Sequence, residues 1–564
     1  MAVLVFALGA SAAPLASLAA VPSAPLTQQG EQIQRQQQDQ IDQDQTRILT
    51  SPRGQTVIEV PTHPAAVAPP GSCKIITAIA FENAPRMSAA ERGKLIKPYV
   101  GRCLGLGDVE NLLSDITRFY VQKGEPTTRI YIQPQTLAKG QLVLKVVEGK
   151  VEKIVLDNKG LHGVNLTTAF GDRANRAFNL RVFEQGLDQI NRLASNNATI
   201  DIAPGDAPGE SIIHIRNTAA LPLHLSVSYD NTGEPQTGRN QGAVTVIGDD
   251  LLHLNDQISY TRRQTIPDGQ PNANAYSDSV LLSVPYNALT LTLGYNDSAY
   301  TSQSTTSAGT TFILTGTTRN IFAEMDDVVW RDNRSKLDLS ATVTNKENQN
   351  YLDSVFLPVS SRDLTVLDLM GNYSTIVGQG SVKLGAGLSK GISLFGSLRD
   401  PSGLPGDQPH AEFNKLVANA YVSLPFMAVG RQWTVSSDIE AQYGFSPLYS
   451  SEQIVIGSPY TVRGFLKDSL NNDRGFYAQN ELSTVARLRA FSQVVAVRPH
   501  AGFDFGYASS AASGTARGFL SGVSAGVSAT VGSITVDAYA AKSISHAGLP
   551  DEGVLAFVRA SMSI

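Results

Sequence analysis

The stretch that decides the fold is Leu289-Thr290-Leu291-Thr292-Leu293-Gly294-Tyr295, in which apolar residues alternate with small polar ones or glycine. Successive side chains of a β-strand point to opposite faces, so this period of two predicts a strand with one apolar and one polar face. The same alternation occurs at residues 223–229, 337–344 and 433–443. From about residue 221 onward, the chain is therefore predicted to be mainly β.

Alternation alone fits a soluble β-sandwich as well as a membrane barrel, and two further features favour the barrel. The polar faces carry hydroxyl and charged side chains that suit a water-filled lumen, and many segments reach the nine to eleven residues that cross a bilayer. A strand is expected at 554–564, with Val554, Val558, Met562 and Ile564 facing lipid. At roughly 20 residues per strand with its loop, residues 219–564 have room for about 16 strands.

Composition and motifs exclude several classes of function. A net charge of −5 in 564 residues argues against nucleic acid as a partner, and after the N-terminus no apolar run is long enough for a membrane-spanning helix. Residues 522–526 match the Gly-x-Ser-x-Gly nucleophile motif, but they lie in an alternating stretch with no following helix, which predicts a strand. With no phosphate-binding loop and no clustered metal ligands, we expect no enzyme, no cofactor and no metal.

The N-terminal residues differ in composition from the rest. Residues 1–24 are apolar and rich in small residues, which predicts a secretory signal. Residues 25–48 are rich in Gln and Asp with isoleucines at 33, 41 and 48, which is compatible with a polar helix or with a disordered leader. Residues 49–72 hold several prolines and read as an extended linker.

Two small α/β units are predicted between this linker and the barrel, at 73–149 and 150–218. The first has an expected strand at 74–81, a helix opened by the capping box of Ser88 and Glu91, a second helix capped by Asp108, and strands at 129–132 and 141–147. The second has an expected strand at 151–156, a helix holding Phe183, Leu187, Ile190 and Leu193, and strands at 198–203 and 211–215. The repeated order indicates a tandem repeat of one unit.

The chain has two cysteines, Cys73 and Cys103. In an exported protein a single pair is usually a disulfide, which here would stabilise the fold by about 3–4 kcal/mol through loop closure. Two unpaired thiols are the alternative.

With these elements in order, the chain resembles the outer-membrane transporters of two-partner secretion, the haemolysin-activator and filamentous-haemagglutinin-transporter family. The resemblance covers almost everything after the signal. It implies a plug helix at 25–48, a linker at 49–72, two POTRA domains at 73–149 and 150–218, and a 16-stranded barrel at 219–564.

Short strings carry the resemblance, each in the expected element. In the α/β units and the first barrel hairpin they are Gly124 with Thr127, Thr128 and Tyr131; Val147-Glu148-Gly149-Lys150-Val151; Leu180, Arg181, Glu184, Gln185, Gly186 and Leu187; Pro204-Gly205; Pro208-Gly209-Glu210-Ser211; Asp230-Asn231; and Thr237-Gly238. The most specific are Val462-Arg463-Gly464-Phe465 in a long loop and Phe503-Asp504-Phe505-Gly506 on a later strand.

The resemblance implies that this loop folds into the lumen and that its wall partner is the second motif. Opposite charges on Arg463 and Asp504 then predict a bidentate ion pair that holds the loop in place. The implied function is a pore that recognises an unfolded exoprotein in the periplasm through its POTRA domains and secretes it without nucleotide. The expected partners are a large adhesin, haemolysin or contact-dependent toxin and outer-membrane lipid, with no nucleic acid and a monomeric barrel. The alternative is an insertase that assembles other β-barrel proteins into the outer membrane.

Overall fold

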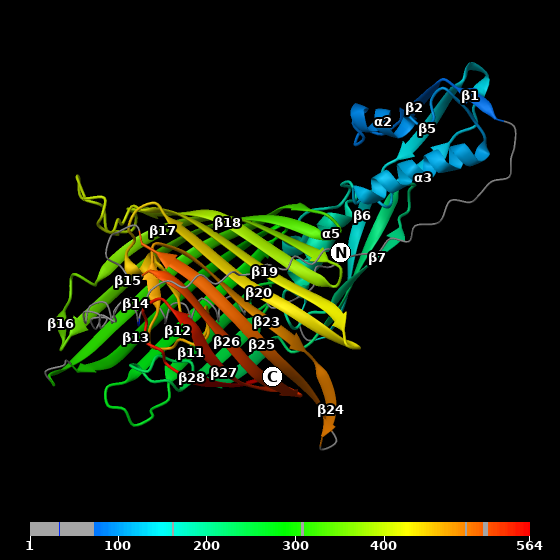
Figure 1. Ribbon diagram of the computed structural model, residues 1–564. Helices are drawn as coiled ribbons and strands as arrows, with labels where there is room; N and C mark the ends of the chain where they lie inside the picture. Colours follow the sequence, from blue (N-terminus) through cyan, green and yellow to red (C-terminus); the bar gives the residue numbers. More distant parts are fainter. Residues whose placement is uncertain (1–32, 34–72, 161–162, 306–308, 491–492, 511–516) are drawn as a thin grey trace, which may run out of the picture.

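The computed structural model of the chain describes residue 33, residues 73–160, 163–305, 309–490, 493–510 and 517–564 (Figure 1). The predicted signal and linker, and the predicted plug helix apart from Ile33, lie outside the described residues. In the part of the chain that is described, no helix is both long and apolar enough to cross a membrane.

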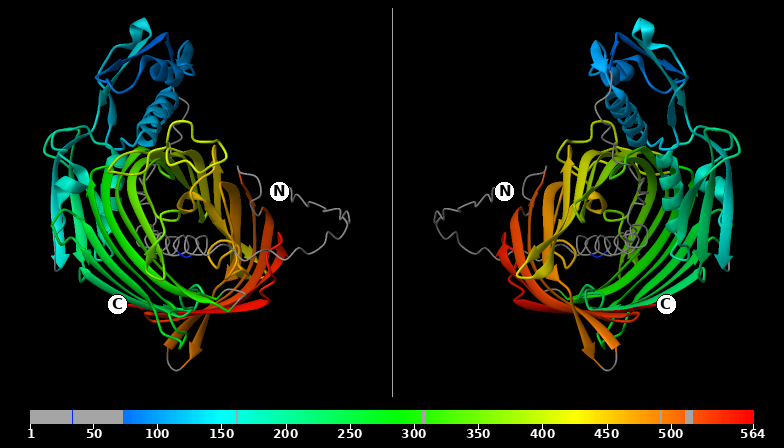
Figure 2. Two further views of the ribbon diagram at one scale, coloured as in Figure 1. Left: turned by 90° about the vertical axis from the view of Figure 1, so that its left-hand side faces the viewer. Right: turned by 90° about the vertical axis from the view of Figure 1, so that its right-hand side faces the viewer.

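The C-terminal part forms a closed antiparallel barrel, seen end-on in Figure 2. Among the described residues, eighteen strand segments take part. Segment β16 (Val355–Phe356) only extends the hairpin after β15, and β24 (Ala486–Ala490) continues β23 along β25, so the wall has sixteen strands. The ring closes where the last strand pairs with the first, Met562 lying opposite Val227. The predicted barrel and its strand number are confirmed.

The wall strands are β9 (Leu223–Asp230), β10 (Gln241–Asp249), β11 (Gln257–Thr265), β12 (Asn274–Tyr286), β13 (Leu289–Thr305), β14 (Thr311–Arg331), β15 (Ser335–Leu352), β17 (Arg362–Val377), β18 (Gly380–Ile392), β19 (Asn414–Ala428), β20 (Arg431–Gly444), β23 (Arg474–Thr484), β25 (Gln493–Ser509), β26 (Gly518–Val531), β27 (Ile534–His546) and β28 (Val554–Ser563).

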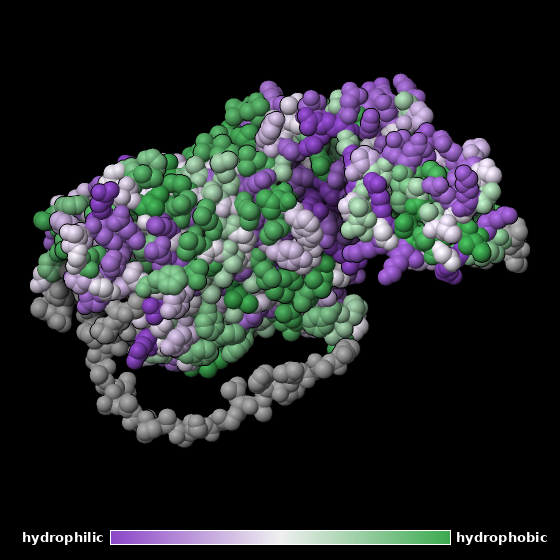
Figure 3. All heavy atoms as spheres, turned by 90° about the horizontal axis from the view of Figure 1, so that it is seen from above, coloured by the Kyte–Doolittle hydropathy of each residue, from purple (hydrophilic) through white to green (hydrophobic). Residues whose placement is uncertain are grey.

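The apolar residues of the alternating pattern lie on the outer face of the barrel, and the polar residues lie on its inner face. In β9, Leu223, Leu225 and Val227 are exposed, and their polar neighbours lie on the opposite, less exposed face. The apolar set predicted for the last strand is exposed as well, from Val554 to Ile564. In Figure 3 hydrophobic residues gather over the side of the barrel, whereas hydrophilic residues are more frequent over the two small units. This is the surface expected of a protein whose barrel faces hydrocarbon.

The first α/β unit packs two helices against the three-stranded sheet β2-β5-β4. Its elements are β1 (Lys74–Ile76), β2 (Ala78–Glu82), α2 (Ala89–Ile96), β3 (Arg102–Leu104), α3 (Leu106–Gln122), β4 (Arg129–Ile132), η1 (Leu137–Lys139) and β5 (Gln141–Val147). Leu112, Ile116 and Tyr120 of α3 are completely buried against β5. Each such side chain contributes about 1.5–3 kcal/mol through removal from water.

The structure confirms the capping box of Ser88 and Glu91 and corrects three predictions for this unit. The strand expected at 74–81 is two strands, and a further strand, β3, lies between the helices. The N-cap of α3 is Gly105 rather than Asp108. The Asp108 carboxylate instead accepts a hydrogen bond from the backbone N–H of Gly105 (2.9 Å) from within the first turn.

The extra strand explains how the two cysteines meet. β1 and β3 pair antiparallel, with Ile75 opposite Cys103, and this pairing brings the Cα atoms of Cys73 and Cys103 to 5.3 Å. The two residues form a disulfide across 30 positions of sequence, as predicted. The bond therefore ties the start of the unit to the connection after its first helix.

The second α/β unit repeats the design with the sheet β6-β8-β7. It contains β6 (Lys150–Gly160), a short helix α4 (Leu166–Phe170) that was not predicted, α5 (Leu180–Asn191), β7 (Ala198–Pro204) and β8 (Glu210–Ala219). Phe183, Leu187 and Ile190 of α5 fill its core as expected, but Leu193 lies just beyond the helix end.

The second unit is bound directly to one rim of the barrel. Arg331, at the end of β14, donates to Asp188 of α5 (2.6 Å), and its Nε lies 3.5 Å from Glu184. At the turn between β10 and β11, the fully buried Asn255 donates a hydrogen bond to Thr168 Oγ1 of α4 (2.7 Å). Because Glu184, Thr168 and Asn255 are buried and polar, the contact is specific in geometry, and the second unit is held at a defined angle to the barrel.

Candidate functional site

The connection between β20 and β23, residues 445–473, packs against the inner face of the barrel wall. It contains the short helix η2 (Ser450–Glu452) and a small hairpin of β21 (Ile454–Ile456) with β22 (Leu470–Asn472). The hairpin closes the base of the loop tip, which carries Val462-Arg463-Gly464-Phe465. All four of these tip residues are buried.

Arg463 at this tip meets Asp504 of β25. Its Nε lies 2.6 Å and its Nη2 2.8 Å from the two carboxylate oxygens, which is the bidentate arrangement. The backbone N–H of Arg463 (3.1 Å) and that of Asn480 (3.0 Å) donate to the same carboxylate. The side chain of Asp504 is 0% exposed and that of Arg463 7%. The pair is thus buried and fully hydrogen-bonded.

Three glycines make room for this approach. A Cβ at Gly502 would lie 2.2 Å from Arg463 Nη2, and one at Gly522 would lie 1.8 Å from the carbonyl oxygen of Arg463. Gly464 has φ +107° and would place a Cβ 2.4 Å from the backbone nitrogen of Ser543 in β27. The loop backbone therefore lies directly on β26 and β27, which only glycine permits.

Apolar side chains fix the loop on both sides of the ion pair. Val462 and Phe465 are 0% exposed and belong to a cluster with Ile456 of β21 and Leu520 of β26. The ring of Phe465 meets that of His546 edge-on at 6.2 Å. The loop thus has its own small core against the wall.

The wall motif Phe503-Asp504-Phe505-Gly506 divides its residues between the two faces of β25. Asp504 and Gly506 point inward, and a Cβ at Gly506 would lie 2.7 Å from Ile456 of the loop. Phe503 and Phe505 point outward, where Phe505 also contacts Phe476 and Phe519. The spacing of the motif is the period of the strand: inward positions receive the loop and outward positions face lipid.

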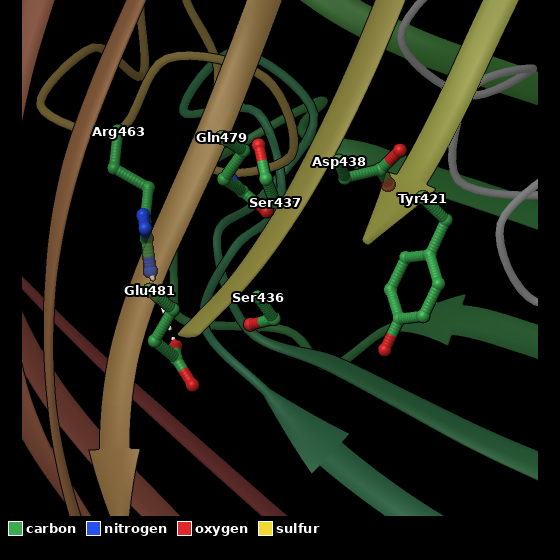
Figure 4. A pocket seen from close by; sticks show the side chains of 7 residues that line it. All are labelled: Tyr421, Ser436, Ser437, Asp438, Arg463, Gln479 and Glu481. Carbon is green, nitrogen blue, oxygen red and sulfur yellow. Dashed lines mark hydrogen bonds and ion pairs between the residues drawn. The ribbon is translucent and has the colours of Figure 1, made fainter. Parts of the chain in front are cut away.

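Beside the ion pair the wall is hollowed by a cavity of about 170 Å³, shown in Figure 4. Arg463 and Glu481 point toward one another there, with Nη1 3.5 Å from Oε2. Glu481 in turn pairs with Arg498 and lies 3.4 Å from His500. The remaining lining residues are Tyr421, Ser436, Ser437, Asp438 and Gln479. The pair of Arg463 and Asp504 is therefore one end of a charged network along the inner wall.

A second anchor of the loop was not predicted from the sequence. Glu452 of η2 is 1% exposed and accepts from Lys346 of β15 (2.7 Å) and from Lys415 of β19 (3.1 Å). The three residues are far apart in sequence and belong to no motif, so only the fold brings them together. The loop is thus held at its tip by Arg463 and at its stem by Glu452.

Ile33 also lies inside the barrel. It is helical and 2% exposed, and it packs against Ala275, Tyr300 and Leu314 of β12, β13 and β14. The rest of the helix predicted at 25–48 lies outside the described residues.

One further sequence feature takes the place expected of it. Residues 522–526 lie within β26, so the Gly-x-Ser-x-Gly string is strand. Within the residues that the structure describes, no group of three or more His, Cys, Asp or Glu side chains could hold a metal ion.

Comparison with known families agrees with this arrangement. The family model described as "Haemolysin secretion/activation protein ShlB/FhaC/HecB" matches residues 209–529. A POTRA domain of ShlB type matches residues 75–149, and a second POTRA domain matches residues 150–204.

Individual proteins are similar over most of their length. The hemolysin transporter protein ShlB of Serratia marcescens is 31% identical over 447 residues, covering 78% of this chain and 77% of that protein. The outer membrane transporter CdiB of Dickeya dadantii is 30% identical over 420 residues, 73% of each chain. The solved structure of CdiB from Escherichia coli superposes with a TM-score of 0.84 at 27% identity, covering 97% of this chain and 100% of that one.

Proposed function

This chain belongs to the haemolysin secretion/activation family ShlB/FhaC/HecB of outer-membrane transporters, and from that premise we propose that it secretes one large exoprotein through its barrel. In this proposal, residues 1–24 direct export, a plug helix at 25–48 and a linker at 49–72 precede the POTRA domains at 73–149 and 150–218, and the barrel at 219–564 conducts the client. The observation that carries it is the inward loop held by Arg463 and Asp504 in a sixteen-stranded barrel behind two POTRA domains.

The POTRA domains receive the client while it is unfolded. The edge that supports this step is β4, which pairs only with β5 and so has one side without a strand partner among the described residues. Tyr131 and Ile132 are exposed there, at 49% and 41%. An extended chain can add to such an edge through backbone hydrogen bonds, which requires free donors and acceptors and hence an unfolded client.

Transport itself needs no nucleotide in this proposal, because the barrel wall provides a polar path and the loop provides the gate. The lumen face of the strands is rich in hydroxyl groups, with Ser259, Ser279, Thr292 and Ser298 among its buried positions. The client is expected to be an adhesin, a haemolysin or a contact-dependent toxin. The two curated transporters compared above support secretion over the insertase alternative.

The test measures client binding and secretion together. The client to be tested is any large exported protein that is encoded beside this chain, and its unfolded form should bind the full-length transporter far better than its folded form. Tyr131→Asp should weaken both binding and secretion, because a charge at the free edge opposes strand addition. Asn111→Asp on the exposed face of α3 in the same domain is the matched control, because a helix offers no strand edge, and it should change neither. Equal binding of folded and unfolded client would refute capture by strand addition.

A further inference from the structure

One hairpin leaves the barrel wall. β24 and the start of β25 continue past the ends of their neighbours, since β25 pairs with β26 only from Val495 and β20 pairs with β23 only as far as Thr484. In Figures 1 and 2 this hairpin projects outward from the circumference of the barrel, at the end where the POTRA domains lie. It therefore lies beside the periplasmic mouth and not over it.

The hairpin carries exposed apolar side chains on both of its faces, unlike the wall strands, and its face of inward parity also carries Arg487 and Arg489. Val485 and Val494 occupy positions of inward parity and are 57% and 54% exposed, while Leu488 has outward parity and is 55% exposed. The neighbouring turn between β19 and β20 adds Met427 at 72% and Val429 at 94%. An apolar patch of this kind on a surface turn marks a place that another phase or molecule covers.

The charges around this patch are all positive. Residues 424–433 and 485–497 contain Arg431, Arg487 and Arg489 and no Asp or Glu. Within the described residues neither Arg487 nor Arg489 takes part in an ion pair, whereas Arg498, farther along the hairpin, pairs with Glu481. Trp433 stands at the same rim, on the outward face of β20. Exposed aliphatic residues with arginines and a Trp are the composition of a membrane interface.

We propose that this hairpin, with the turn at 427–429, is embedded in the inner-leaflet headgroup layer of the outer membrane and binds anionic phospholipid there. The aliphatic side chains on both faces enter the upper acyl region, and Arg487 and Arg489 reach phosphate groups. The position outside the barrel circumference, continuous with the lipid-facing band, favours lipid over a client polypeptide, which must pass through the mouth. The positive charge favours an anionic headgroup.

The test places a fluorescent label at Leu488→Cys in the full chain, with the native disulfide intact. The protein is reconstituted in vesicles of phosphatidylethanolamine and phosphatidylglycerol. Nitroxides placed near the headgroup should quench the label about as strongly as they quench one at Val435→Cys on the lipid-facing wall. Aqueous iodide should reach the label poorly. A label at Glu82→Cys on the first POTRA domain is the water-exposed control.

The charge requirement is tested separately. Nitroxide on phosphatidylglycerol should quench the Leu488→Cys label more than nitroxide on phosphatidylethanolamine, with a preference of roughly fivefold for each arginine at most. The double variant Arg487→Gln with Arg489→Gln should lose that preference, while quenching at Val435→Cys stays the same and so reports correct insertion.

Three outcomes would overturn the proposal. Iodide access at Leu488→Cys equal to that at Glu82→Cys would place the hairpin in water. Energy transfer between differently labelled copies that follows protein density would make the patch a contact between two copies. Protection from iodide that appears only with unfolded client would make it a docking surface for the client.

Discussion

Replacing Arg463 by alanine should release the loop tip from the barrel wall without unfolding the barrel. The substitution removes two charge-assisted hydrogen bonds to Asp504, of 2.6 and 2.8 Å, and leaves a carboxylate of 0% exposure with only two backbone donors, Arg463 N and Asn480 N. Breaking one side of a buried pair costs about 3–5 kcal/mol, whereas an exposed pair is worth about 0–1 kcal/mol. Because both partners are buried, the larger cost of about 3–5 kcal/mol applies to this pair.

The assay is the labelling rate of a buried reporter cysteine, Val462→Cys, which is 0% exposed in the closed loop. A loss of about 3–5 kcal/mol raises the open population roughly a hundredfold to several thousandfold, and the labelling rate rises with it. Arg319→Ala is the matched control, because Arg319 pairs with Glu347 at 3.5 Å on the outer face with 54% exposure. That control should leave labelling within about fivefold of wild type.

Secretion of the partner should fall in Arg463→Ala and in Asp504→Ala, while heat-modifiable barrel remains in the membrane. The charge-swapped protein, Arg463→Asp with Asp504→Arg, should recover part of the loss. Recovery is partial because the backbone N–H of Asn480 points at the position of the carboxylate and would then face a guanidinium. Wild-type labelling and wild-type secretion in both single variants would refute the reasoning.

Three further expectations concern other parts of the chain. Glu452→Gln should loosen the loop stem and lower secretion several-fold, because Lys346 and Lys415 lose their shared carboxylate. The control Glu347→Gln on the outer face should leave secretion unchanged. Equal secretion in the two variants would show that Glu452 does not anchor the loop. Deleting residues 25–48 should raise ion conductance in planar bilayers while leaving secretion largely intact, since Ile33 packs on the inner wall; unchanged conductance would place this segment outside the lumen. Hydrogen bonds from the Ser88 backbone and from Lys123 lower the pKa of Glu91 to about 2. The stability that this carboxylate adds to α2 is therefore present above its usual pKa of 4.5 and is lost as the pH falls toward about 2. Hydrogen exchange of residues 89–96 should therefore quicken over that window relative to α3, and the Glu91→Gln variant should show no such change.

Local patterns in the sequence determined the fold class and the order of its parts. Alternation with period two is a property of the strand itself, so residues such as those at 289–295 reveal their two faces before any partner strand is known. The capping box of Ser88 and Glu91 lies within four consecutive residues, and the structure has it as predicted. The two motifs around Arg463 and Asp504 were singled out by their resemblance to strings of a known family, and strings this short can be matched before the fold is known.

Contacts between distant segments were decided by the tertiary structure alone. β3 is a strand only because β1 lies beside it, and its own three residues carry no strand pattern. Glu452 forms ion pairs with Lys346 and Lys415, which are 106 and 37 positions away in the sequence, and Arg331 pairs with Asp188, which is 143 positions away. The outward turn of β24 depends on where the strands on either side end. Such contacts form only when distant segments pack together, and no local stretch encodes that packing, so the single side chains that take part look ordinary in the sequence.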